Sequence, residues 1–228
     1  MCIRDSSQIE LRLMAHFSGD PLLVHAYQTG MDIHTLTAAE VFGVDAATMD
    51  KETRARAKAV NFGIVYGISP FGLAANLGID QKTAREYIER YFARYKGVAE
   101  FIERTLAEVR QTQAVRTAFG RVRPIPDIQS RNPNQRGFAE RTAVNTPLQG
   151  TAADLIKLAM IRIDREILQR GLRSQMTLQV HDELLFDVVP EEAEEMQALV
   201  KEQMEGVAAF RVPIVADVGL GQNWRDIK

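Results

Sequence analysis

Acidic side chains that could bind a metal ion occur near both ends of the sequence. Asp5 and Glu10 lie near the start, and Asp182 and Glu183 follow an apolar run close to the other end. Two carboxylates that meet without a positive neighbour repel each other, and Mg²⁺ relieves this while also binding substrate phosphate oxygens. If the segments that carry Asp5 and Asp182 pair as strands, the sequence predicts a magnesium site there.

For the two glutamates a purely structural role is also sufficient. Ser7 and Glu10 fit the S-x-x-E capping box at a helix start, and Glu183 fits a solvated turn. Asp182 is harder to explain in this way, because the run Val180-His-Asp-Glu-Leu184 puts polar groups between two apolar segments.

A second candidate group has a spacing of four residues: Arg54, Lys58, Phe62 and Tyr66. On a helix this spacing gives one slowly drifting row, with two cations followed by two aromatic rings. The cations suit a polyphosphate, and the rings suit a sugar and base. Gly63 and Gly67 follow the rings, and since a helical glycine costs about 1 kcal/mol against alanine, something is expected to approach this backbone closely. The alternative is a purely structural role, in which the cations are solvated and the rings belong to the hydrophobic core.

Other functional classes lose support from what the sequence lacks. It contains no G-x-G-x-x-G, no G-x-x-x-x-G-K-[ST] and no G-x-S-x-G. The four histidines show no zinc-ligand spacing, and the single cysteine, Cys2, excludes an internal disulfide. No apolar run approaches the ~18 residues that span a bilayer, and residues 1–6 do not resemble a signal peptide. We therefore expect a cytoplasmic protein with no membrane partner.

Charge is distributed unevenly over the 228 residues, although the net charge is only −2. Residues 1–50 carry 2 basic and 7 acidic side chains, residues 51–141 carry 17 and 9, and residues 142–228 carry 9 and 14. A basic block between acidic flanks suits a site where carboxylates hold metal ions and cations hold phosphates. Hydrophobic (46%) and charged (25%) fractions are those of an ordinary globular protein.

Mostly helical elements must position these groups. Amphipathic periodicity predicts helices over residues 7–17, 32–42, 51–66, 80–112, 152–170 and 190–205. Residues 116–135, rich in Pro, Asn and Arg, predict an irregular basic loop. Residues 176–181 and 184–189 predict a hairpin with Asp182 and Glu183 at its turn, and residues 212–218 a further strand. Strands at both ends and helices between them predict an α+β fold.

Three segments together resemble the A, B and C motifs of family A DNA polymerases: Asp5-Ser-Ser-Gln-Ile-Glu-Leu-Arg12, Arg54-x-x-x-Lys58-x-x-x-Phe62-Gly-x-x-Tyr66-Gly67 and Val180-His-Asp-Glu183. The likeness continues through Thr117-x-x-Gly120-Arg121, Arg141-x-x-x-Asn145-x-x-x-Gln149-Gly150 and Gly219-x-Gly221-x-Asn223-Trp224. Three motifs in register over more than 170 residues make a specific signal.

The resemblance implies mostly helical fingers inserted into a palm with a small antiparallel sheet. The palm would comprise residues 1–31 and 133–228, and the fingers residues 32–132. The chain would be the C-terminal catalytic fragment of a DNA-directed DNA polymerase, a monomer that acts on primer-template DNA and deoxynucleoside triphosphates. Because the upstream thumb is absent from these residues, we expect the fragment alone to be poorly active.

The resemblance also implies a role for each motif residue. Asp5 and Asp182 would bind two Mg²⁺ ions, which Mn²⁺ could replace, and Glu183 would support them. The incoming nucleotide would meet Glu10, His34, Arg54, Lys58, Phe62 and Tyr66, with Lys58 also acting in catalysis. The primer-template minor groove would meet Arg141, Asn145, Gln149 and His181. A DNA-binding module without catalysis and a metal-dependent nuclease remain as alternatives.

Overall fold

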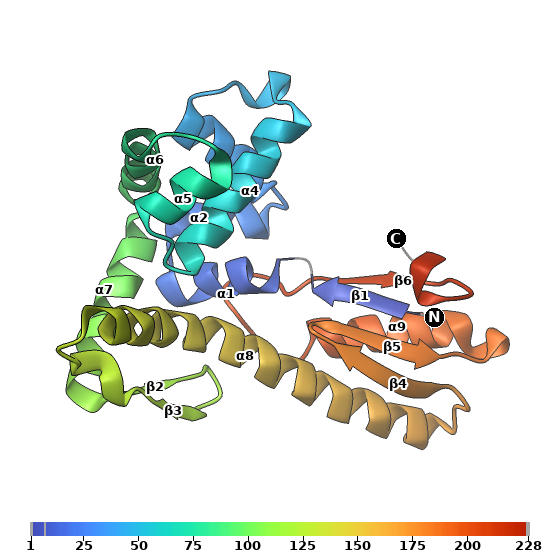
Figure 1. The fold of residues 1–228 in the computed structure, drawn as a ribbon. Helices are drawn as coiled ribbons and strands as arrows, with labels where there is room; N and C mark the ends of the chain where they lie inside the picture. Colours follow the sequence, from blue (N-terminus) through green and yellow to red (C-terminus); the bar gives the residue numbers. More distant parts are fainter. Residues whose placement is uncertain (1, 7, 227–228) are drawn as a thin grey trace. The chain divides into compact units, whose positions relative to one another are not determined.

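The computed structural model describes residues 2–6 and 8–226, with the backbone alone for residues 2–6 and 225. Helices make up most of it: α1 (Ile9–Ser18), α2 (Pro21–Gln28), α3 (Ile33–Thr37), α4 (Lys51–Val65), α5 (Pro70–Leu77), α6 (Gln81–Arg94), α7 (Lys96–Thr112), α8 (Pro133–Arg170) and α9 (Ala193–Glu205). The strands are β1 (Cys2–Ser6), β2 (Ala114–Arg116), β3 (Val122–Pro124), β4 (Gln175–Val180), β5 (Glu183–Asp187) and β6 (Ala216–Gly219) (Figure 1). This confirms the predicted α+β class. Within the part of the chain that is described, no helix combines the length and the apolar character needed to cross a membrane.

The chain divides into two compact units. One contains Met1–Arg12 and Thr151–Lys228, and the other contains Leu13–Gly150. Both ends of the chain thus belong to the same unit, and the middle forms the other. These limits differ from the limits after residues 31 and 132 that we predict for palm and fingers, so the palm and fingers assignment stays a prediction.

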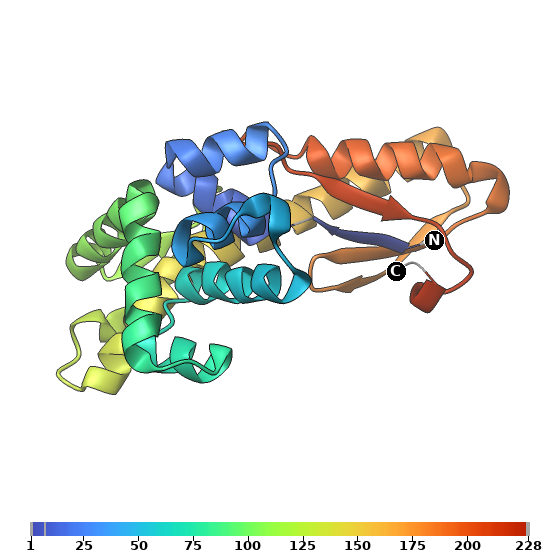
Figure 2. The same cartoon turned by 90° about the horizontal axis from the view of Figure 1, so that it is seen from above.

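An antiparallel sheet in the order β4-β5-β1-β6 organises the first unit. β1 pairs with β5 through Cys2↔Leu185 and Ile3↔Leu184, so residues from opposite ends of the sequence become neighbours, as expected. Along β5 the side chains of Leu184 and Phe186 are buried. Helix α9 buries Met196, Leu199 and Val200 and contacts β6, which runs beside it (Figure 2). The predicted strand over 212–218 is shorter than expected, because β6 begins at Ala216.

Aspartates begin several helices of the second unit: the side chains of Asp20, Asp32, Asp50 and Asp80 accept backbone amide hydrogens at the N-termini of α2, α3, α4 and α6. The single helix predicted over 80–112 is wrong, since α6 and α7 separate at Tyr95. The Gly97 amide donates to the Asp20 carboxylate at 3.0 Å. A Cβ at Gly97 would lie 2.8 Å from the Asp20 backbone, so this close packing fixes where α7 starts.

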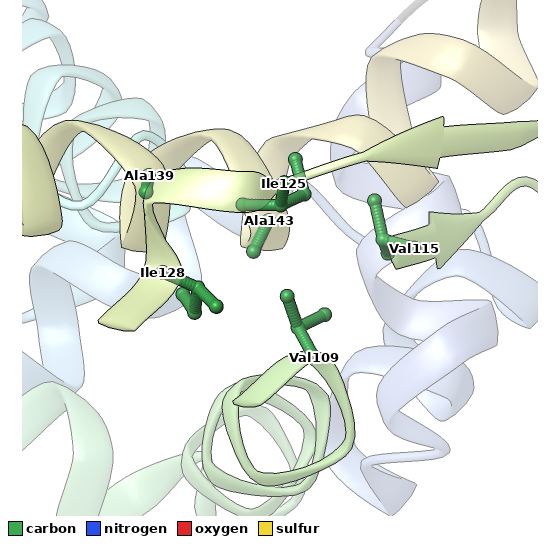
Figure 3. Packing of buried hydrophobic residues seen from close by; sticks show 6 residues of the cluster. All are labelled: Val109, Val115, Ile125, Ile128, Ala139 and Ala143. Atoms are coloured by element: carbon green, nitrogen blue, oxygen red, sulfur yellow. The ribbon is translucent and has the colours of Figure 1, made fainter. Parts of the chain in front are cut away.

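The irregular loop predicted over 116–135 is also wrong. Strands β2 and β3 pair there, a 3₁₀ turn covers Pro126–Gln129, and α8 already begins at Pro133. Buried side chains from α7, the β2–β3 hairpin, the 3₁₀ turn and α8 converge in one cluster: Val109, Val115, Ile125, Ile128, Ala139 and Ala143 (Figure 3). These apolar residues are widely spaced between prolines and arginines, which hid the cluster from sequence periodicity.

Candidate active site

The candidate residues belong to both compact units, and each group is described within its own unit. In the first unit, β4 ends at Val180 and β5 begins at Glu183, and these two residues pair. The turn therefore consists of His181 and Asp182, one residue earlier than predicted. His181 has φ 53°, a left-handed conformation that costs free energy in residues other than glycine. Such strain clusters at functional sites, and here it points to the residue directly before Asp182.

Strand pairing brings the segments of the two aspartates together. β1 and β5 pair through Cys2↔Leu185 and Ile3↔Leu184, so the strand that contains Asp5 lies beside the strand that directly follows the turn at Asp182. The pairing of β1 with β6 is irregular between Arg4 and Ser6, so the register does not fix which residue faces position 5. The side chain of Asp5 lies outside the described part of the chain, whereas Asp182 is half-exposed at the turn. The strand pairing on which the metal-site prediction depends is therefore present.

The glutamates of this unit differ in their surroundings. Glu183 lies in strand β5, not in the turn, and its carboxylate accepts a hydrogen bond from Trp224 Nε1 at 3.0 Å. This bond ties the C-terminal segment to the start of β5. Glu10 is half-buried in the first turn of α1, and the capping partner predicted for it, Ser7, lies outside the described residues.

The donor groups at this turn suit a hard cation. Among the described residues, no group of three or more His, Cys, Asp and Glu side chains forms a ready metal cage. Mg²⁺ does not require one, because it is commonly bound by one or two carboxylates together with water and substrate phosphates. Two acidic positions, one in β1 and one at the turn that precedes the neighbouring strand β5, fit that pattern.

In the second unit, α4 carries the predicted row of cations and rings. Arg54, Lys58 and Tyr66 are exposed and Phe62 is half-buried. Lys58 Nζ lies 6.0 Å from the centre of the Phe62 ring. The Phe62 and Tyr66 rings are stacked with their centres 6.4 Å apart. The row is therefore continuous, and of the two cations Lys58 borders the rings.

Arg54 has a partner that sequence reasoning missed. Its Nε donates to Asp32 Oδ2 at 2.5 Å, and Asp32 also accepts hydrogen bonds from the His34 amide and the Thr35 hydroxyl. Burial alone would raise the pKa of Asp32, but the hydrogen bonds, that from Arg54 above all, outweigh it and lower the pKa. The ion pair fixes Arg54 beside the start of α3.

The two glycines beside the rings are explained by the chain itself. Gly67, at φ 70°, ends α4 in a Schellman motif, in which the Ile68 amide donates to Gly63 O and the Gly67 amide donates to Ile64 O. A Cβ at Gly63 would lie 3.0 Å from Ile68, and one at Gly67 would lie 3.0 Å from Arg141. The close approach predicted at this backbone is therefore made by protein side chains.

His34 lies in α3 and is 1% exposed. Burial lowers its pKa to about 4, so the ring is neutral near pH 7. Its ring centre is 6.0 Å from that of Phe62, and its Nδ1 lies 3.0 Å from Asn61 Nδ2. Sequence analysis did not select Asn61, although a polar residue between the apolar Val60 and Ile64 of α4 was a usable signal.

A third row lies on α8. Arg141, Asn145 and Gln149 are again four residues apart and so share one side of the helix, opposite Ala139 and Ala143 of the buried cluster. Arg141 and Gln149 are exposed. Asn145 Oδ1 is buried and has no hydrogen-bond partner among the described residues.

The β2–β3 hairpin braces this row. Arg121 donates to Gly150 O at 2.9 Å, and Arg123 donates to the Thr146 hydroxyl at 3.3 Å. A Cβ at Gly150 would lie only 2.7 Å from Thr117, so the glycine is needed for the hairpin to sit this close to α8.

Comparison with known proteins gives concordant matches. The model of the family described as DNA polymerase family A matches residues 1–226. The chain is 51% identical over 225 residues to DNA polymerase I of Lactococcus lactis subsp. lactis and 49% identical over 224 residues to DNA polymerase I of Geobacillus stearothermophilus. Each alignment covers 98% of this chain and 26% of the relative, so the chain spans about a quarter of the length of these curated relatives.

A solved structure gives the same result for the fold. The POL domain of Pol1 from M. smegmatis, in complex with DNA primer-template and dNTP, superposes with a TM-score of 0.95 at 42% identity. The match covers 99% of this chain and 40% of that one.

Proposed function

The chain belongs to DNA polymerase family A, and from this membership we propose that it carries out template-directed DNA synthesis. Its substrates would be deoxynucleoside triphosphates, added to the 3′ end of a primer paired with a DNA template. The pairing of β1 with β5 is the observation that carries the proposal, because it brings the strand that contains Asp5 beside the strand that follows Asp182, although these residues are 177 positions apart in the sequence.

We assign the chain to the palm and fingers of such an enzyme, with the sheet in the palm and α4 in the fingers. We further propose that it is a monomer in the cytoplasm, associated with nucleoid DNA.

The acids of the first unit would hold the metal ions. Asp5 and Asp182 supply hard oxygen donors for two Mg²⁺ ions, with Mn²⁺ as a possible substitute, and the Trp224 bond to Glu183 keeps the neighbouring strand end in place. When bound, such ions activate the primer 3′-hydroxyl and neutralise charge on the triphosphate and the departing pyrophosphate.

The cations of α4 would bind the triphosphate. Lys58 has its ammonium group exposed beside Phe62 and would donate a proton to the leaving pyrophosphate. Arg54 is paired with Asp32, but an exposed pair contributes only ~0–1 kcal/mol. A triphosphate, with several negative charges, can therefore compete for the Arg54 guanidinium.

The remaining residues would read the nucleotide and the duplex. Phe62 would pack against the incoming sugar and base, Tyr66 would lie near the templating base, and Glu10 would crowd the sugar 2′ position. The α8 row and His181 would face the minor groove, where acceptors are shared by all base pairs and permit checking that is independent of sequence. The DNA contacts proposed are Arg141, Asn145, Gln149 and His181.

Primer extension tests the proposal. The chain, and an extended enzyme lengthened at the N-terminus to the size of its curated relatives, are given a primer whose next template base is dG, with each deoxynucleotide in turn. We expect incorporation of dCTP alone, dependent on Mg²⁺ or Mn²⁺ and much faster for the extended enzyme. DNA binding without extension would favour a binding module, and strand cleavage would favour a nuclease.

A further inference from the structure

Asp32 accepts one hydrogen bond that the start of α3 does not require. Its Oδ1 atom accepts the His34 amide at 3.0 Å and its Oδ2 atom accepts the Thr35 hydroxyl at 2.9 Å. These bonds to the next turn of its own chain cap the helix. The same Oδ2 atom also accepts Arg54 Nε at 2.5 Å, from a residue 22 positions further along the sequence. Because the capping bonds fix the carboxylate, it can in turn hold the arginine.

Asp80 shows that such a cap is complete without an arginine. At the start of α6 its Oδ1 atom accepts the Lys82 and Thr83 amides, and its Oδ2 atom accepts the Thr83 hydroxyl. No cationic side chain pairs with Asp80 in the part of the chain that the structure describes. Since α6 starts with these bonds alone, the Arg54 bond is not needed to start α3, and its main effect is on Arg54.

The bond occupies only one donor of the arginine. The Arg54 guanidinium is planar and carries N–H donors on Nε, Nη1 and Nη2. Asp32 takes Nε, and neither Nη1 nor Nη2 donates to any residue that the structure describes. The Arg54 side chain is 46% exposed, so both Nη atoms are open to a ligand. Together they form a fork that can bind two oxygens of one phosphate group.

The charge of Asp32 opposes the binding of an anion at Arg54, but only weakly. Although burial acts the other way, hydrogen bonds lower the pKa of Asp32, so its carboxylate is charged near pH 7. The two side chains are 35% and 46% exposed, and solvent and salt screen such charges. A free arginine, by contrast, loses much of its rotamer entropy when it binds a ligand. Fixing Arg54 beforehand removes this cost, and we expect that gain to be the larger effect.

We propose that Asp32 is a positioning residue for nucleotide binding, which holds Arg54 through Nε so that Nη1 and Nη2 present a preformed fork to a phosphate group of the incoming triphosphate. The inference rests on the proposed function, which places Arg54 at the triphosphate. Although a triphosphate can break a pair of this kind, it need not do so, because the fork binds phosphate while Nε stays on Asp32. The pair thus lowers the entropic cost of binding.

Calorimetric titration of the full chain with dCTP and Mg²⁺ tests this. In Asp32→Asn the amide oxygen can still accept the His34 amide, but the NH₂ group then replaces Oδ2 and cannot accept Arg54 Nε. We expect dCTP to bind about fivefold more weakly, with little change in the urea midpoint of unfolding. Asp80→Asn, at a cap without an arginine, is the matched control and should leave the affinity unchanged.

Two further measurements separate an effect through Arg54 from a general change in charge. In an Arg54→Ala background, Asp32→Asn should no longer alter the affinity for dCTP. In ¹⁵N NMR of the unaltered chain, the bond to Asp32 should shift the Arg54 Nε–H signal downfield, and the signal should stay there when dCTP binds. Asp32→Asn should abolish that shift.

Failure of the inference and failure of the proposed function are distinguishable. Tighter dCTP binding by Asp32→Asn would make Asp32 a competitor of the phosphate, and an unchanged affinity would make the pair incidental. Either result, or an equal effect of Asp32→Asn with and without Arg54, overturns the inference, while the function stands if Arg54→Ala weakens dCTP binding. If Arg54→Ala binds dCTP as tightly as the unaltered chain, the nucleotide-binding role of Arg54 is itself wrong, and the inference is wrong with it.

Discussion

The hairpin turn at His181–Asp182 and the α3–α4 pair position their functional groups in opposite ways. At the turn, backbone pairing does the positioning, and Asp182 is left half-exposed. Between α3 and α4, buried side chains do it, through the bonds that link His34, Asn61 and Thr37. A residue placed by the backbone can be removed without loss of the fold, whereas a residue placed by a buried network contributes to both stability and function.

The largest effect should come from the turn. We expect Asp182→Ala to lower the rate of nucleotide addition by the extended enzyme by at least ~10³-fold, because metal-ion stabilisation of the transition state amounts to several kcal/mol. The free energy of unfolding should change by no more than about 0.5 kcal/mol, as for other surface substitutions. Single-turnover extension and urea unfolding measure the two quantities.

Two outcomes would contradict what we expect of the turn. Normal extension by Asp182→Ala would reject the metal role. A large loss of stability would show that the turn, like the α3–α4 pair, depends on its side chains. Asp187→Asn, at the exposed far end of β5, is the control and should change neither quantity.

Lys58 lies on α4 but is exposed. Its replacement should therefore lower the rate of incorporation with little loss of stability, as expected for Asp182. We expect Lys58→Ala to slow incorporation by about 10²-fold, the usual cost of removing one group that meets charge developing in the transition state. Lys51→Ala, at the exposed first position of the same helix, is a charge-matched control. An unchanged single-turnover rate at saturating nucleotide would remove Lys58 from the catalytic residues.

The free energy of unfolding that buried His34 contributes should depend on pH. His34 has a pKa of about 4 when folded, below the ordinary 6.5, so the unfolded chain binds more protons between these values. Stability from the neutral ring is fully present above pH 6.5 and falls as pH decreases toward 4. At pH 4.5 the loss should be about 2–3 kcal/mol.

Urea unfolding of the unaltered chain and of His34→Gln, each at pH 7 and pH 4.5, isolates this loss. Between pH 7 and pH 4.5, His34→Gln should lose about 2–3 kcal/mol less stability than the unaltered chain. Equal losses of stability in both proteins would mean that His34 is not held neutral by burial. The α3–α4 pair would then differ less from the turn in how much its stability depends on a buried side chain.

The smallest effect concerns Phe62. Its side chain is half-buried and lies between the exposed Lys58 and Tyr66 side chains and the buried His34 ring. We expect Phe62→Tyr to raise acceptance of dideoxynucleotides by about tenfold, because the added hydroxyl can replace the contact that the missing 3′-hydroxyl no longer makes. Competition between dideoxy and deoxy substrates gives the ratio, and the melting temperature reports stability. An unchanged ratio in a destabilised protein would make Phe62 a core residue.

The sequence predicted what depends on local spacing. The α4 row follows from residues four apart on a helix, and the strands around Asp182 follow from two apolar runs. It did not predict the break at Tyr95, which depends on Gly97 packing against Asp20, or the β2–β3 hairpin, whose core comes from distant segments. Asn61 and Asp32 were missed for the same reason, since their partners lie 27 and 22 residues away.

The central claim is that Asp5 and Asp182 form one metal site because β1 pairs with β5. Counting bound Mn²⁺ by electron paramagnetic resonance, in the extended enzyme with primer-template and dCTP, tests it most directly. We predict that Asp5→Ala and Asp182→Ala each bind fewer ions than the unaltered enzyme, and that the double variant loses fewer ions than the sum of the two single losses, because the residues share one site. Asp187→Asn should bind as many ions as the unaltered enzyme. Undiminished Mn²⁺ binding by both single variants would contradict the account.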